Sequence, residues 1–145
     1  MPLWKIYHPE GAFSPEQKQD IAQTITGLYA PRLPKFYVGV VFQAVAADAF
    51  FVGGEPATNF VRIWVDHIAR TLPNAEARTW WVNHCVKTLA PFIGDRGFDW
   101  EFHIDETSYD LWAINGMRPP LPDTEDEKRW KVENRPSPLT AERAA

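Results

Sequence analysis

The chain has 145 residues, of which 45% are hydrophobic and 14% aromatic, enough for one domain with a hydrophobic core. The formal net charge is −4 and basic residues form no run, so the composition does not indicate a surface for nucleic acid or anionic membranes. The single cysteine, Cys85, excludes an internal disulfide, fits no zinc-ligand spacing and is interpreted as core packing. No apolar run approaches the roughly 18 residues needed to span a bilayer. We expect a cytoplasmic protein without a metal site.

The first eight residues predict a β-strand that begins at the amino terminus. Two sets of side chains alternate along it with the period of two that is typical of a strand: Leu3, Lys5 and Tyr7 in one set, and Trp4, Ile6 and His8 in the other. Removal of Met1 would leave a free secondary amine on Pro2. An apolar strand of this kind is expected inside a sheet, where burial and nearby cations lower the pKa of an amine. A neutral amine can act as base or nucleophile; the alternative is an ordinary strand without chemistry.

A β-α-β unit is predicted over the next part of the chain. Ser14 is placed as helix N-cap, Pro15 as the first helical residue and Gln17 as the partner in a capping box. Apolar residues follow at helical spacing until Pro31 ends the helix: Ile21, Ala22, Ile25, Leu28 and Tyr29. Residues 36–45 are rich in β-branched and aromatic side chains, which predicts a buried strand parallel to the first.

The same pattern then recurs. A short extra strand is predicted at 50–52 before the turn at Gly53 and Gly54, followed by a strand at 60–67, a helix at about 74–90 and a strand at 98–104. Two tandem β-α-β units predict an α+β fold, a four-stranded sheet with two helices on one face. The other face would carry aromatic side chains without a helix to cover them, so we expect a closed oligomer.

The chain is divided into a domain at 2–118 and a proline-rich, acidic extension at 119–145. Prolines and a run of acidic residues predict that the extension is extended and poorly packed. Trp130 is the exception, because a tryptophan could attach this segment to the domain or to a neighbouring subunit. An exposed Trp130 is the other interpretation.

Five features together resemble the tautomerase superfamily, in its branch of cis-3-chloroacrylic acid dehalogenase and fungal relatives of the oxalocrotonate tautomerase type. They are Pro2 at the start of a strand, the tandem β-α-β units, the turn at 51–54, Arg70 after the third strand, and the segment 111–116 before Pro119 and Pro120. The resemblance covers about residues 2–120. It implies a homotrimer and a cofactor-free enzyme that acts on a small-molecule carboxylate.

The resemblance also implies site residues. Pro2 is implied as the catalytic amine, a general base or acid according to its charge, and Arg70 as the cation that binds a substrate carboxylate. Tyr29 and His103 stand where the dehalogenase has a histidine and a tyrosine, and both can donate hydrogen bonds. Trp112 is a candidate for the wall of the pocket.

Two departures from the dehalogenase pattern bear on the reaction. Pro73 replaces a second arginine, and Ile114 stands where a glutamate activates water, so Ile114 can only contact the substrate. Asn115 is adjacent and polar, and could orient a water or a carbonyl, but an amide is not a base. Asp66 and His67 near Arg70 could tune the pocket, and the interpretation we favour is a strand cap.

Keto–enol tautomerisation needs only a base and groups that hold the carboxylate and enolate oxygens. The candidates for that set are Pro2, Arg70, Tyr29, His103 and Asn115. We therefore favour a tautomerase acting on a small 2-keto or 2-hydroxy-enoic carboxylate. Two alternatives stay open: a hydratase, dehalogenase or decarboxylase for a small unsaturated acid, and a trimeric binding protein without chemistry.

Overall fold

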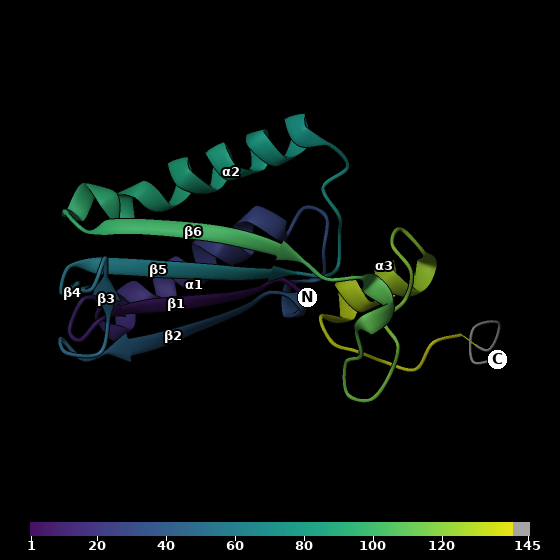
Figure 1. Cartoon of the computed structure of the whole chain (residues 1–145). Coiled ribbons are helices and arrows are strands. Elements are labelled where there is room, and N and C mark those ends of the chain that lie inside the picture. Colours follow the sequence, from purple (N-terminus) through teal and green to yellow (C-terminus); the bar gives the residue numbers. More distant parts are fainter. Residues whose placement is uncertain (141–145) are drawn as a thin grey trace.

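A computed structural model describes residues 1–140, and the last five residues of the predicted extension lie outside them. Its centre is a four-stranded mixed sheet in the order β2-β1-β5-β6 (Figure 1). β1 (Leu3–Pro9) pairs in parallel with β2 (Gly39–Val45) and antiparallel with β5 (Phe60–His67). β5 pairs in parallel with β6 (Asp99–Glu106). The predicted interior position of the first strand is confirmed.

Each parallel pair is joined by a helix. α1 (Pro15–Tyr29) connects β1 to β2, and α2 (Ala75–Leu89) lies between β5 and β6. Every second residue of β1 and β5 is buried, and these side chains share one core cluster with buried residues of both helices. The helices therefore pack on the same face of the sheet, and the predicted α+β arrangement is confirmed.

The helices begin where the sequence predicts. Ser14 accepts from the backbone N–H of Gln17 while the Gln17 side chain accepts from the N–H of Ser14, which is the predicted capping box. Asn74 caps α2 with a single bond, in which its side-chain oxygen accepts from the N–H of Ala77. Cys85 on α2 is fully buried, and this burial raises the pKa of its thiol to about 12, so it is a packing residue.

The strand predicted at 36–45 is shorter and more exposed than expected. A 3-10 turn, η1 (Lys35–Tyr37), takes up the first residues, and β2 begins only at Gly39. β2 is an edge strand with only one neighbour, so its side chains are partly exposed and the prediction of a buried strand was wrong. The predicted extra strand is β3 (Phe51–Val52), which pairs with β4 (Glu55–Pro56) around Gly53 and Gly54, both at positive φ.

Short 3-10 turns complete the domain. η2 (Ala90–Phe92) and η3 (Gly94–Arg96) lead from α2 into β6, and η4 (Tyr109–Leu111) follows β6. None of the helices in residues 1–140 is long and apolar enough to cross a membrane.

The extension contains a packed helix, so the prediction of an extended, poorly packed segment was wrong. α3 (Glu125–Glu133) lies at the end of the sheet where the amino terminus is found (Figure 1). Trp130 is completely buried and its ring contacts Phe36 and Tyr37 at centroid distances of 5.9 and 6.4 Å. The structure therefore confirms the interpretation that Trp130 attaches the extension to the domain. The acidic run was misleading because three acidic residues in a first turn favour a helix N-terminus.

The face of the sheet opposite the helices is partly polar. Lys5 pairs with Asp66 at 2.8 Å and its ammonium lies 4.2 Å from the centroid of a Trp64 ring. Trp64 and Val41 are also 37% and 46% exposed, which is substantial for large apolar side chains. A surface of this kind is suited to contact with another protein surface.

Replacement of Trp130 by alanine should lower the free energy of unfolding by about 3–5 kcal/mol, because a fully buried tryptophan leaves a large cavity. Urea denaturation monitored by far-UV circular dichroism measures the change. Val132 on the same helix is 87% exposed, so Val132→Ala is the matched control and should change stability by less than about 0.5 kcal/mol. Equal effects of the two substitutions would show that α3 is not packed as described.

Candidate active site

The amino-terminal end of β1 is held inside the sheet. Pro2 is buried, and its carbonyl accepts a hydrogen bond of 2.9 Å from the N–H of Gly39 at the start of β2. On the other side, Leu3 is paired with Asp66 of the antiparallel β5, which places Pro2 level with His67. The position of Pro2 is therefore set by both neighbours of the central strand.

An amine at this end of β1 is held in its neutral form. With Met1 present, burial lowers the pKa of the Met1 amine to about 4, and the positive charge of Arg70 acts in the same direction. Because an amine is uncharged above its pKa, this one is neutral at pH 7. A neutral amine can accept a proton.

Tyr29 is the last residue of α1 and points into the same region. Its hydroxyl oxygen accepts a hydrogen bond of 3.1 Å from Nε1 of Trp4, and its own proton remains available as a donor. Burial raises the pKa of Tyr29, so the phenol stays protonated at neutral pH. Its ring contacts those of His67 and Trp81 at centroid distances of 5.6 and 5.2 Å.

Arg70 follows β5 and is fixed by two sets of hydrogen bonds. Its Nη1 donates to the carbonyl of Ala69 at 2.8 Å. Its Nη2 donates to both carboxylate oxygens of Glu127, at 2.9 and 3.2 Å. Glu127 comes from α3, so the extension contributes a charged group to the candidate site.

His67, at the end of β5, is part of this region; the sequence suggested that it could tune the pocket, although a strand cap was the favoured interpretation. Its side chain is buried, and Nδ1 has no hydrogen-bond partner among the described residues. Burial lowers the pKa of His67, the nearby charge of Glu106 opposes this, and the terminal amine lowers it again. The imidazole is therefore held neutral at pH 7, and an unpartnered buried ring nitrogen is available to a ligand.

An open groove of about 1240 Å³ is lined by Tyr29, His67, Arg70 and Glu127. It is formed by the end of α1, the segment between β5 and α2, α2 as far as His84, and α3 with the residues before it. Its walls include the aromatic residues Tyr29, Trp80 and Trp81 and the charged residues Arg70 and Glu127. Trp81 Nε1 is a further buried polar atom without a partner among residues 1–140. A concave site with aromatic walls and a few convergent polar groups is typical of small-molecule binding.

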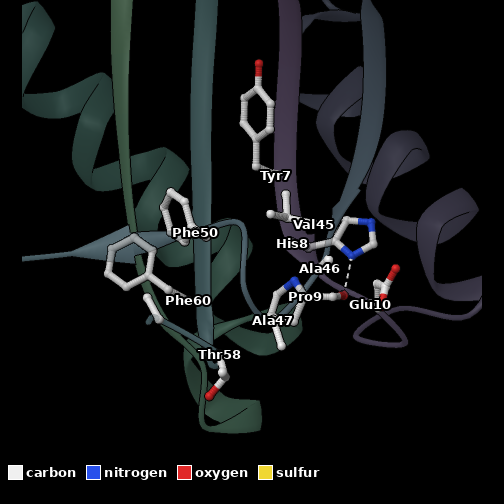
Figure 2. Close-up of a pocket in the computed structure, with 11 residues that line it drawn as sticks. Tyr7, His8, Pro9, Glu10, Val45, Ala46, Ala47, Phe50, Thr58 and Phe60 are labelled. Atoms are coloured by element: carbon white, nitrogen blue, oxygen red, sulfur yellow. Dashed lines mark hydrogen bonds between the residues drawn. The ribbon is translucent and has the colours of Figure 1, made fainter. Parts of the chain in front are cut away.

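A second, smaller cavity of about 230 Å³ lies at the other end of β1 (Figure 2). Figure 2 shows Phe50 and Phe60 on one side and the His8 ring on the other. His8 Nδ1 is already bonded to the carbonyl of Pro9 at 2.8 Å. The larger groove, with its charged and unpartnered polar groups, is therefore the candidate active site.

His103 lies away from the groove. It is on β6, on the face of the sheet opposite the helices, where its ring stacks on Trp64 at a centroid distance of 5.5 Å. It is hydrogen-bonded to Arg62 and lies 3.4 Å from a carboxylate oxygen of Asp105. In one copy of the chain, His103 therefore does not meet Arg70 or Tyr29.

The segment after β6 also lies outside the groove walls. Ile114 and Met117 bond to each other through both backbone groups, at 2.8 and 2.9 Å, which closes a tight turn. Asn115 is exposed in this turn with φ of 50°. Trp112 is buried against Tyr37, at a centroid distance of 4.8 Å, and does not form a wall of the groove.

Metal chemistry has no evident site in the described part of the chain. Among residues 1–140, no group of three or more His, Cys, Asp or Glu side chains is arranged to hold a metal ion. The available chemistry is that of a neutral amine, a guanidinium with its carboxylate partner, a phenol and a neutral imidazole. Such a set can move a proton and hold an oxyanion without a cofactor.

Two solved structures are close relatives of this chain. RhCC from Rhodococcus jostii RHA1 is 46% identical, with a TM-score of 0.92 over 94% of this chain and 99% of RhCC. A probable enzyme from the thermophilic fungus Aspergillus fumigatus is 41% identical, with a TM-score of 0.90 over 96% of this chain and 98% of that protein. No curated protein sequence matches the chain.

More distant structures share the fold. N1, a member of the cis-3-chloroacrylic acid dehalogenase family, is 20% identical, with a TM-score of 0.69 over 91% of this chain and 97% of N1. A fused 4-OT protein that forms an asymmetric trimer is 17% identical, with a TM-score of 0.65 over 80% of this chain and 94% of that one.

A family model matches residues 1–135, a range that includes the amino-terminal strand, Arg70 and α3. The family is described as "Putative oxalocrotonate tautomerase enzyme". The resemblance noted in the sequence is thus confirmed, and the chain belongs to this family of tautomerase-type enzymes.

Proposed function

We propose that the chain is a cofactor-independent tautomerase that interconverts the keto and enol forms of a small 2-keto or 2-hydroxy-enoic carboxylate. The amine of Pro2, exposed by removal of Met1, is the proposed base and acid. The observation that carries this proposal is the buried end of β1, where desolvation and Arg70 lower the pKa of the Met1 amine and would act in the same direction on a Pro2 amine. Neither Met1 nor Pro2 belongs to the groove wall, but His67, level with Pro2, and Arg70 do.

The proposed reaction has a simple proton balance. The neutral Pro2 nitrogen accepts the proton of the enol hydroxyl. The electron pair of the O–H bond then forms the C=O double bond, and the electron pair of the C=C bond takes up a proton at the neighbouring carbon. The Pro2 ammonium supplies that proton, so the amine returns to its neutral form. Arg70 would hold the substrate carboxylate, and Tyr29 would donate to the enolate oxygen.

Four further residues remain proposed site residues on the condition that a second copy of the chain is present: His103, Asn115, Trp112 and Ile114. None of them lies in the groove wall of one copy. They would have to reach an active site across an interface with a second copy, and His103 lies on the partly apolar open face that is suited to such contact. The proposed assembly is a homotrimer, the state of the fused 4-OT protein that shares this fold.

The alternative reactions need a group that activates water. Ile114 has no proton chemistry, and Asn115 lies in an exposed turn. Glu127 is a carboxylate in the groove wall, but both of its oxygens accept hydrogen bonds from Arg70, and Oε2 accepts another of 2.8 Å from the N–H of Asp123. These contacts favour tautomerisation over hydration or dehalogenation as the proposed reaction.

Pro2→Ala should lower kcat for enol-phenylpyruvate by about 10²–10⁴-fold, because the proton-transferring ring nitrogen is replaced. The loss of enol absorbance measures turnover, and mass spectrometry establishes that Met1 is absent from both proteins. Pro91→Ala, at an exposed position in η2, is the matched control. Full activity of Pro2→Ala would show that Pro2 has no catalytic role. If the parent protein itself does not turn over the substrate, the alternative of a binding protein is favoured.

Retention of Met1 should abolish activity, since the Pro2 nitrogen is then an amide without a basic lone pair. Two preparations of one protein, with and without Met1, allow the comparison at constant sequence elsewhere. Their masses differ by one methionine and identify each form. Equal kcat values for the two forms would contradict the proposal.

Arg70→Ala should mainly raise KM for carboxylate substrates, by an amount equivalent to about 2–4 kcal/mol if the charge pair is desolvated. Arg32, an exposed arginine elsewhere in the groove wall, provides the control Arg32→Ala. Because Arg70→Ala leaves the buried Glu127 unpaired, urea denaturation should accompany the kinetics. An unchanged KM in a folded Arg70→Ala variant would show that another cation binds the substrate carboxylate.

The pH dependence follows from the position of the amine. A base must be neutral, so kcat/KM falls as pH drops through the pKa of the amine. The ordinary pKa of the Met1 amine is 8.0, and burial with the charge of Arg70 lowers it at this end of β1, so we expect the pKa of a Pro2 amine to be lowered as well. The kcat/KM profile of the protein without Met1 should therefore stay level from about pH 8 down to about pH 6. An acid limb with a midpoint near pH 8 would mean that the Pro2 nitrogen is solvent-exposed.

A further inference from the structure

Glu127 already occupies the cation to which a substrate carboxylate would bind. The Arg70 guanidinium donates through Nη2 to both Glu127 oxygens, at 2.9 and 3.2 Å, and the Glu127 side chain is only 6% exposed. Oε2 also accepts the 2.8 Å hydrogen bond from the N–H of Asp123. Glu127 therefore forms a buried, multiply bonded ion pair at the inner part of the groove.

The surrounding helix keeps this carboxylate in place. Glu127 lies in the first turn of α3, where Thr124 caps the helix through the Glu127 N–H. One turn further on, Trp130 is fully buried, and Lys131 donates to the carbonyl of Pro31 at 2.9 Å. These contacts fix the backbone of α3, and the hydrogen bonds from Arg70 and from the N–H of Asp123 orient the Glu127 carboxylate on it.

Three groups near Glu127 do not offset its negative charge toward a second anion, and the remaining cations of the groove wall, Arg32 and Lys131, are not paired with Glu127. Tyr37 is buried close by, and burial together with the charge of Glu127 raises the pKa of its phenol, so it remains neutral. His67 is also held neutral by burial. Lys128 in the groove wall is paired with Glu125 at 2.6 Å. A ligand carboxylate at Arg70 thus shares its cation with another carboxylate.

We propose that Glu127 is a specificity-determining residue that competes with ligand carboxylates for Arg70 and so selects monoanionic ligands over dianionic ones. The inference rests on the proposed function in one respect, namely that the substrate carboxylate binds to Arg70. In this partly buried setting, repulsion between Glu127 and a carboxylate bound at Arg70 grows with ligand charge. Pro73 provides no second cation beside Arg70, and the other cations of the groove wall without an ion pair among the described residues, Arg32 and Lys131, come from other segments. The substrate is accordingly a keto or enol acid with one carboxylate, and dicarboxylates bind poorly.

The test compares three non-reacting ligands of related shape by isothermal titration calorimetry: phenylacetate, phenylacetamide and 1,4-phenylenediacetate. Glu127→Gln retains the shape of the side chain and an acceptor for Arg70 but removes the charge. It should lower Kd for phenylacetate by about tenfold, lower Kd for the dianion by a larger factor, and leave Kd for the amide within about twofold. Glu133→Gln makes the same charge change at the other end of α3 and should leave all three values unchanged.

Two results would overturn the inference. Equal Kd values for phenylacetate in wild type and Glu127→Gln would show that Glu127 does not compete for Arg70. Weaker binding of phenylacetate by a folded Glu127→Gln, with the amide unaffected, would instead assign Glu127 to the orientation of Arg70.

Equilibrium binding keeps this test separate from catalysis by Pro2. If Pro2→Ala retains full turnover and Glu127→Gln changes the preference for ligand charge, the proposed function is wrong. The proposed selection of ligands by Glu127 is then still supported. The reverse pattern, inactive Pro2→Ala and an unchanged charge preference, removes only the role of Glu127.

Discussion

Pairing of β1 on both sides is the constraint on which the candidate site depends. A chain terminus is usually mobile, and a mobile amine would be fully hydrated and charged at neutral pH. Here β2 and β5 flank the first strand, and the carbonyl of Pro2 is bonded to Gly39. Burial of this end shifts the amine toward its neutral form, so backbone pairing in the sheet has a direct chemical effect.

The second element of the site is the ion pair that joins the domain to α3. Arg70 comes from the segment after β5, and Glu127 from a helix 57 residues further along the chain. A buried pair of this kind contributes little net stability, because desolvation of both charges offsets their attraction. The packing of Trp130 holds α3 in place, and the pair then defines the charge of the inner groove. Residues 119–140 are thus a part of the site rather than an appendage.

The open face of the sheet links the site to assembly. His103 and Trp64 lie there, on the side opposite the groove, together with the ion pair of Lys5 and Asp66. In a single copy these groups contribute nothing to the groove around Arg70. If copies of the chain pack through this face, side chains that are distant within one copy can meet across the interface. The way in which copies of the chain assemble would therefore determine which side chains take part in the candidate active site.

The amino-acid sequence by itself determined the fold class and most of the secondary structure of the domain, with its elements in order. Local signals were sufficient for these features: alternation in the strands at 3–9 and 60–67, and a capping box at Ser14. The helix at 125–133 was missed although Thr124 and Glu127 have the spacing of a capping box, because the acidic and proline-rich composition was given more weight.

Only the tertiary structure decided which charged groups meet. It brought Arg70 to Glu127, left His67 buried beside Tyr29, and placed His103 on the opposite face of the sheet. Such contacts depend on how helices and loops pack across long separations in the chain, and local patterns carry no information about that packing. Sequence periodicity specifies the face on which a residue lies, whereas its partner and its protonation state follow from the three-dimensional surroundings.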